Sequence, residues 1–186
     1  MATAKVAIIL GSLRKASFNR QLAKAVERLA GDRFVFSILE IGDLPLYNQD
    51  DDADFPAAGL RFKRGIEAAD ALLFVTPEYN RSIPGVLKNA IDVASRPSGS
   101  TTLAGKRAAI IGTSPGAHGT VSAQQHLRNV LSAVDVAVLA QPEIKAKFAA
   151  SGAEVHSQGP ADFAAFVKAD NEKWAKLVRE RKLQLD

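Results

Sequence analysis

The chain has 186 residues, of which 47% are apolar and 24% are charged, and its formal net charge at neutral pH is +4. These values are typical of one globular domain, and no apolar run is long enough to cross a bilayer. The absence of cysteine from the sequence excludes disulfides, thiol catalysis and cysteine metal sites. We therefore expect a single domain over residues 1–186, located in the cytoplasm, with neither nucleic acid nor a membrane as a partner.

Short apolar runs alternate with amphipathic segments along the whole sequence. The apolar runs predict strands at residues 6–10, 34–38, 71–76, 108–113 and 134–139. The amphipathic segments predict helices at residues 17–30, 57–69, 84–94, 121–133 and 160–182. Strands that are almost wholly apolar are typical of a parallel sheet covered on both faces. The expected fold is therefore α/β, a doubly wound five-stranded parallel sheet of order 2-1-3-4-5 with helices on both faces.

The loop after the first predicted strand has the composition of a phosphate site. Gly11 ends the strand, and a helix begins a few residues later. Because the N–H groups at a helix N-terminus are unpaired and carry partial positive charge, they favour a phosphate. Ser12 and Ser17 add hydroxyl donors, and Arg14 adds a positive charge. The loop lacks the glycine patterns of nucleoside-triphosphate and dinucleotide sites, so it predicts a phosphate monoester. The alternative is an ordinary turn with a serine N-cap.

An acidic loop at residues 42–56 follows the second predicted strand. It contains four closely spaced aspartates: Asp50, Asp51, Asp52 and Asp54. They lack the regular spacing and the distal glutamate of a calcium loop. We therefore expect a solvated or interface loop and no metal site.

The loop after the third predicted strand, residues 77–85, is suited to a planar heterocycle. Tyr79 can lie against a ring, and Asn80 can bond to heteroatoms at its edge. Alternatively, the loop only caps the following helix, with Ser82 as the cap. Glu78 is a candidate general base, although a surface carboxylate is the commoner role.

The loop after the fourth predicted strand, residues 113–120, is rich in small residues that permit close backbone approach. Ser114 has no recognisable His/Asp partners, and His118 is expected at an exposed position. Ligands of doubly wound sheets bind where the first and third strands end, so these loops should converge there. They offer no acid–base pair, nucleophile or metal cluster, so a cofactor must supply the chemistry. A phosphate monoester on a flat ring points to FMN.

Two longer motifs resemble those of the NADPH-dependent FMN reductase family, in particular its bacterial quinone reductases that also reduce chromate. The first is Gly11-Ser12-x-Arg14-x-x-Ser17-x-Asn19. The second is Pro77-Glu78-Tyr79-Asn80-x-Ser82-Ile83-Pro84-Gly85, continuing through Leu87-Lys88-Asn89-Ala90-Ile91-Asp92. The resemblance implies a flavodoxin-like fold, tightly held FMN, and homodimers or homotetramers. Val93 departs from it, because many relatives have tryptophan at that position.

The resemblance also implies which residues contact FMN, in three groups. The residues at the FMN phosphate are Ser12, Arg14, Ser17 and Asn19, with Phe18 beside them. The residues at the ribityl chain and the ring comprise Pro77, Glu78, Tyr79, Asn80 and Ser82. The third loop contributes Ser114 and Gly116. No residue of this chain is predicted to be catalytic, because the flavin carries the chemistry.

These interpretations predict an FMN-dependent NAD(P)H oxidoreductase. NADPH or NADH would supply hydride, and quinones, with chromate as a further small oxidant, would accept electrons in the same pocket by a ping-pong mechanism. Arg81 is predicted to bind anionic substrates at the rim of this pocket, its alternative being a solvent-facing arginine. Three other functions stay open: a reductase that releases free reduced FMN, a flavodoxin-like electron carrier without a nicotinamide site, and a redox-responsive binding or regulatory protein.

Overall fold

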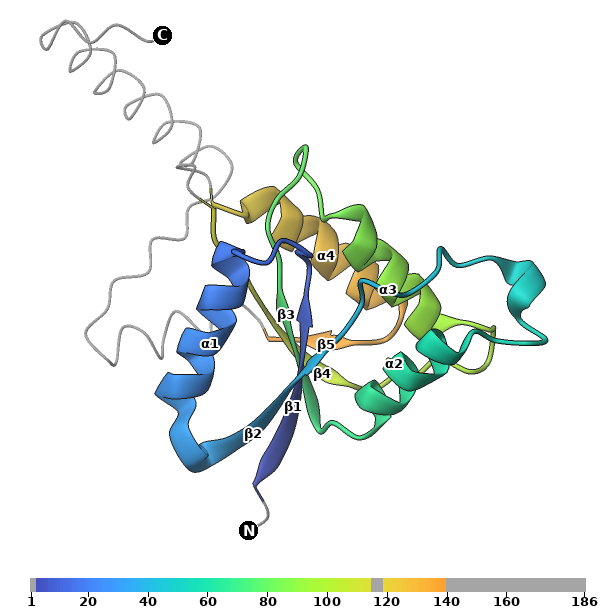
Figure 1. The fold of residues 1–186 in the computed structure, drawn as a ribbon, viewed down its shortest axis with the longest axis horizontal. Helices are drawn as coiled ribbons and strands as arrows, with labels where there is room; N and C mark the ends of the chain where they lie inside the picture. The colour runs from blue at the N-terminus through green and yellow to red at the C-terminus, as the bar shows by residue number, and fades with distance from the viewer. Residues whose placement is uncertain (1–2, 115–118, 140–186) are drawn as a thin grey trace, which may run out of the picture. The chain divides into compact units, whose positions relative to one another are not determined.

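The described strands form one parallel sheet. A computed structural model describes residues 3–114 and 119–139, drawn in colour in Figure 1. The strands are β1 (Ala4–Leu10), β2 (Phe34–Leu39), β3 (Ala71–Val75), β4 (Arg107–Ile111) and β5 (Ala137–Val138). Their order is β2-β1-β3-β4-β5, and every neighbouring pair is parallel. This order reverses direction between β1 and β3, and it confirms the predicted doubly wound fold.

Helices connect successive strands. They are α1 (Phe18–Ala30), α2 (Ala57–Glu67), α3 (Gly85–Ser95) and α4 (Val121–Ala133), with short 3₁₀ turns at Gly31–Arg33 and Gln49–Asp51. Their bounds lie within two residues of those predicted from periodicity. The predicted helix at residues 160–182 lies outside the described residues, as do Gly116 and His118. The described ranges belong to one compact unit, Met1–Ala140, and the prediction of a single domain over all 186 residues stays a prediction.

The two faces of the sheet bury different side chains, because successive residues of a strand point to opposite faces. Ala7 and Ile9 of β1 belong to a cluster that includes side chains of α2, α3 and α4. Ile8 and Leu10 belong to a second cluster, which α1 covers. Figure 1 shows α1 on one side of the sheet and α2 and α3 on the other. Within the described part of the chain, no helix is long and apolar enough to span a bilayer.

The strands at the two edges of the sheet depart from the prediction. β5 has two residues where six were predicted, because residues 134–136 close α4: the N–H of Val136 donates to Leu131 O at 3.0 Å, and Asp135 has a φ of 58°. β2 has the predicted position but is not buried on both faces. Phe34 and Val35 are exposed, since β2 has a neighbouring strand on one side only.

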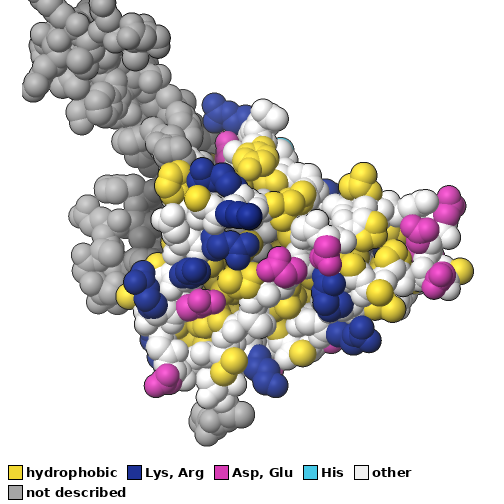
Figure 2. Space-filling view, in the orientation of Figure 1, with side chains coloured by type: hydrophobic (Ala, Val, Ile, Leu, Met, Phe, Trp, Pro, Cys, Tyr) yellow, Lys and Arg dark blue, Asp and Glu magenta, His cyan; other side chains and the backbone are white. Residues whose placement is uncertain are grey.

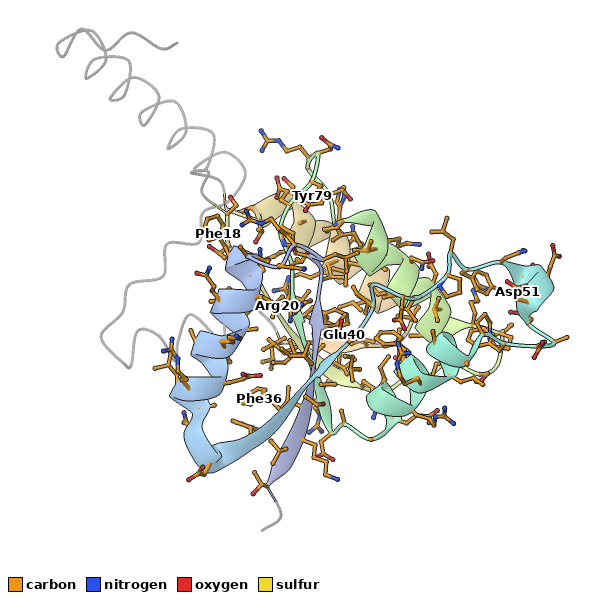
Figure 3. The ribbon with its side chains drawn as sticks, in the orientation of Figure 1. Phe18, Arg20, Phe36, Glu40, Asp51 and Tyr79 are labelled. Atoms are coloured by element: carbon orange, nitrogen blue, oxygen red, sulfur yellow. The ribbon has the colours of Figure 1, made fainter. Side chains whose placement is uncertain are left out.

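The acidic loop at residues 42–56 packs against α3. Asn89 of α3 accepts from the N–H of Tyr47 at 2.9 Å and donates to Pro45 O at 2.8 Å. Partial burial raises the pKa of Tyr47, and its hydrogen bond to Asp52 raises it further. The loop borders a small hollow whose lining includes Phe55, Gly59 and Val93. Asp51 lies far from Tyr79 in Figure 3, so this aspartate is not part of the candidate site below.

Candidate functional site

The strand ends at the reversal point of the sheet are held close together. The N–H of Gly11 donates to Val75 O at 2.9 Å, and the N–H of Thr76 donates to Ile111 O at 3.0 Å. A Cβ on Gly11 would lie 2.8 Å from Thr76 Oγ1, and one on Gly112 would overlap Thr76 O and Thr120 Oγ1. Both positions therefore need glycine for close approach. Thr76, which is fully buried between them, was not singled out from the sequence.

The start of α1 offers a set of donors suited to a phosphate. Ser17 is the N-cap residue, yet its side chain makes no capping hydrogen bond among the described residues. The first turn of α1 carries no acidic residue. Ser12 and Ser17 are buried, while Arg14 is exposed with its guanidinium carbon 5.1 Å from the centre of the Phe18 ring. Helix N–H groups, two hydroxyls and one guanidinium match the chemistry of a phosphate monoester.

Asn19 has a partner that sequence reasoning did not anticipate. Its Nδ2 donates to Thr113 O at 3.0 Å, and its Oδ1 accepts from the N–H of Thr113 at 3.0 Å. The side chain is 3% exposed. Asn19 therefore ties the start of α1 to the loop after β4. Its predicted contact with the phosphate stays a prediction.

The loop between β3 and α3 contains a tight hairpin turn. The N–H of Tyr79 donates to Ser82 O at 3.0 Å, and the N–H of Ser82 donates to Tyr79 O at 2.9 Å. Asn80 and Arg81 have φ values of 50° and 63°, as the central residues of a type I′ turn do. Asparagine tolerates this conformation, whereas arginine adopts it at a cost in free energy. Asn80 and Arg81 are exposed at the tip of this turn, and Tyr79 is 54% exposed.

Both ends of this turn are bonded to α4. Glu78 Oε2 accepts from the N–H of Ala123 at 3.0 Å, so this carboxylate caps the N-terminus of α4. Ser82 Oγ lies 3.0 Å from Nδ1 of His126. Ser82 therefore does not act as the cap of α3, whose N-cap residue is Pro84. His126 was missed in the sequence, because no local pattern links it to a serine 44 positions earlier.

Exposed apolar side chains surround the same edge of the sheet. They are Leu13, Phe18, Tyr79 and Val121. Apolar and basic side chains adjoin one another where α1 begins (Figure 2). Such a mixture of apolar surface and converging polar groups is typical of a small-molecule site.

The remaining predicted residues lie in the same region or outside the described residues. Pro77 and Ser114 are half-buried at the ends of β3 and β4, and Ser114 is engaged in an interaction. Arg81 is exposed at the tip of the hairpin turn. Gly116 lies outside the described residues. The structure thus brings the start of α1, the hairpin turn and the loop after β4 to one edge of the sheet.

Comparison with known proteins identifies relatives for most of the chain. Residues 4–151 match the family model of NADPH-dependent FMN reductases. A 2-hydroxy-1,4-benzoquinone reductase from Burkholderia sp. is 48% identical over 180 residues, covering 96% of this chain and 98% of the relative. A quinone reductase from Pseudomonas putida is 50% identical over 139 residues, covering 74% of this chain and 75% of the relative.

A solved structure shows the same similarity. It is that of FerB, a flavoenzyme NAD(P)H:(acceptor) oxidoreductase from Paracoccus denitrificans, which superposes with a TM-score of 0.73 at 40% identity. The match covers 95% of this chain and 98% of the FerB chain.

Proposed function

Because this chain belongs to the NADPH-dependent FMN reductase family, we propose that it is a quinone reductase that passes electrons from NAD(P)H to a quinone through bound FMN. The observation that carries this proposal is the donor set at the start of α1, located where the strand order reverses between β1 and β3. That is where doubly wound folds bind nucleotide-like ligands. FMN is the cofactor and NAD(P)H the electron donor of this family member.

The N-terminus of α1 is better suited to a phosphate than that of α4. The N-terminus of α4 already has a carboxylate, because Glu78 accepts from Ala123. The first turn of α1, by contrast, contains no acidic residue. Arg14 lies beside this turn, over the ring of Phe18. Ser12 and Ser17 would donate hydroxyl hydrogen bonds to the phosphate, and Arg14 would supply a charge-assisted bond. Phe18, which Arg14 contacts, would complete the wall of this subsite.

The hairpin turn and the loop after β4 would hold the rest of the cofactor. Tyr79 offers the exposed face of an aromatic ring, and Asn80 offers an amide that can bond to the edge of a heterocycle. Pro77, Glu78 and Ser82 would contribute mainly through their backbone, since the side chains of Glu78 and Ser82 are bonded to α4. Ser114 and Gly116 would approach from the third loop.

FMN, when bound, supplies the two-electron chemistry by accepting hydride from the nicotinamide and passing electrons to the oxidant. The protein binds and orients the reactants. We propose that donor and oxidant use one pocket in turn, so that the mechanism is ping-pong. Arg81, exposed at the tip of the turn, would attract anionic groups such as the phosphates of NADPH or chromate.

We also propose a homodimer or homotetramer in the cytoplasm. The absence of cysteine from the sequence fits a protein that needs no disulfides in a reducing compartment. Light scattering on the purified protein measures the oligomeric state directly.

An anaerobic titration tests the proposed function. The purified protein should show flavin absorption bands that bleach when NADPH is added and return when a quinone is added. Bands that persist with both NADPH and NADH would contradict the proposal and indicate an electron carrier. Colourless protein that oxidises NADPH only when free FMN is added would instead indicate a reductase of free flavin.

A further inference from the structure

We propose that α4 positions the flavin-binding turn and that His126 is a positioning residue for the reaction. This inference rests on the proposed function, because it concerns the loop that would hold the flavin ring. Its structural basis is two hydrogen bonds, one donated by the N–H of Ala123 to Glu78 and one between Nδ1 of His126 and Ser82 Oγ. We call these two bonds the α4 clamp.

The α4 clamp holds the turn at both ends. Glu78 comes immediately before Tyr79, the first residue of the turn, and Ser82 is its last residue. Ala123 and His126 are three positions apart in α4 and therefore lie on neighbouring positions of the same helix surface. A single rigid helix thus bonds to both ends of the hairpin.

The turn needs such support because its tip is strained. Asn80 and Arg81 both have positive φ, which non-glycine residues adopt at a cost in free energy. Conformations of this kind persist when surrounding contacts hold them. The carboxylate of Glu78 at a helix N-terminus and the bond between His126 and Ser82 are contacts of that kind.

His126 therefore acts on the cofactor site through Ser82. The imidazole is exposed on α4, and its Nδ1 atom bonds to a hydroxyl of the turn proposed to contact FMN. Losing this bond would leave the turn held at the Glu78 end only. The positions of Tyr79 and Asn80 would then be less restricted, and the loop would bind FMN more weakly.

Two substitutions of His126 distinguish the effect of losing the hydrogen bond from the effect of losing the imidazole ring. Asparagine places a polar amide atom near the position of Nδ1, so His126→Asn can still bond to Ser82. Glutamine places its amide atoms near the position of Nε2, so His126→Gln cannot. Gln125→Leu changes the adjacent exposed residue of α4 and serves as the control.

The measurements use the full-length protein with and without FMN. Amide hydrogen exchange by NMR reports on the N–H groups of Tyr79 and Ser82, whose mutual bonds close the turn. Titration of the FMN-free protein gives the FMN affinity, and steady-state kinetics separates KM from kcat.

In His126→Gln, both amides should exchange about fivefold faster and FMN should bind about fivefold more weakly, which is the effect of one lost neutral hydrogen bond. His126→Gln should also raise the KM for NADPH, because the turn that lines the pocket is then less restricted in position. His126→Asn and Gln125→Leu should resemble the parent.

The outcomes distinguish this inference from the proposed function. Unchanged exchange and unchanged FMN affinity in His126→Gln would overturn the α4 clamp while leaving the proposed function intact. Equal losses in His126→Asn and His126→Gln would also overturn it, because ring packing and not the Nδ1 bond would then be responsible. A parent protein that binds no FMN would overturn the proposed function, and faster exchange in His126→Gln alone would still support the clamp.

Discussion

Asn19, at the start of α1, bonds to both backbone polar groups of Thr113, at the end of β4, with two hydrogen bonds of 3.0 Å each. The amide of one side chain thus takes the place of a neighbouring strand for Thr113. The two residues are 94 positions apart in the sequence. The contact joins the proposed phosphate loop to the third loop of the site.

We expect Asn19→Ala to lower the free energy of unfolding by about 2 kcal/mol, because two hydrogen bonds are lost and Thr113 keeps polar groups without that partner. Urea unfolding of the FMN-free protein measures the change. Asn129→Ala, at an exposed position of α4, is the matched control and should have little effect. An Asn19→Ala protein as stable as the parent would show that these bonds contribute nothing.

Arg14→Ala should weaken FMN binding by about tenfold to a hundredfold, since a hydrogen bond to a charged group contributes about 1.5–3 kcal/mol. Riboflavin, which lacks the phosphate, should bind to the variant and the parent alike. Fluorescence titration of the FMN-free protein measures both. Lys15→Ala removes a neighbouring exposed positive charge and should leave both affinities nearly unchanged. Equal weakening of riboflavin would refute the assignment of the phosphate to this loop.

Arg81→Gly should raise the free energy of unfolding by up to about 1 kcal/mol, because glycine adopts positive φ without strain. The same substitution should raise the KM for NADPH and reduce its dependence on ionic strength, since a screened positive charge is lost. Arg81→Lys, which keeps both the charge and the strain, should retain the salt dependence and the stability of the parent. If the KM for NADPH and its dependence on ionic strength are unchanged in Arg81→Gly, Arg81 is only a solvent-facing residue.

Lys63 provides a prediction about pH and stability. This buried ammonium on α2 donates to Arg96 O and, at 2.7 Å, to Ser100 O. Burial lowers its pKa below the ordinary value of 10.5. Between the lowered pKa and 10.5, the unfolded chain therefore binds more protons at this group than the folded chain does. The contribution of Lys63 to stability should rise with pH across that window and fall as the pH drops through the lowered pKa.

The comparison with Lys63→Met isolates this group, because other titrating residues are common to both proteins. Denaturant unfolding at several pH values approaching 10.5 should show the parent gaining stability relative to the variant as the pH rises. Parallel stability curves would mean that the folded and unfolded pKa values of Lys63 are equal.

The single-pocket proposal predicts ping-pong kinetics. Double-reciprocal plots against NADPH at several quinone concentrations should be parallel, and chromate should replace quinone as the oxidant in the same pattern. Lines that converge would show that donor and oxidant bind together, and two separate subsites would then be required.

Much of the fold could be predicted from local features of the sequence. Apolar runs and helical periodicity placed α1 to α4 within two residues of their ends, and the parallel order followed from the alternation of strands and helices. The proposed position of the site at the ends of β1, β3 and β4 followed from the same order. The two edge strands were predicted less well. Residues 134–136 form the C-terminal end of α4 and not part of β5, and β2 is exposed because it lies at an edge of the sheet.

Side-chain partners at the site depended on tertiary structure. Periodicity along the chain predicts which elements form, and the direction of the chain within a parallel sheet predicts which loops meet. Only the packing of α4 beside the turn decided that Glu78 caps Ala123 and that Ser82 meets His126. Likewise, only the packing of α1 against the end of β4 decided that Asn19 bonds to Thr113. Hydrogen bonds require donor and acceptor to lie within about 3 Å of each other, and no local pattern sets such a distance between residues 44 or more positions apart.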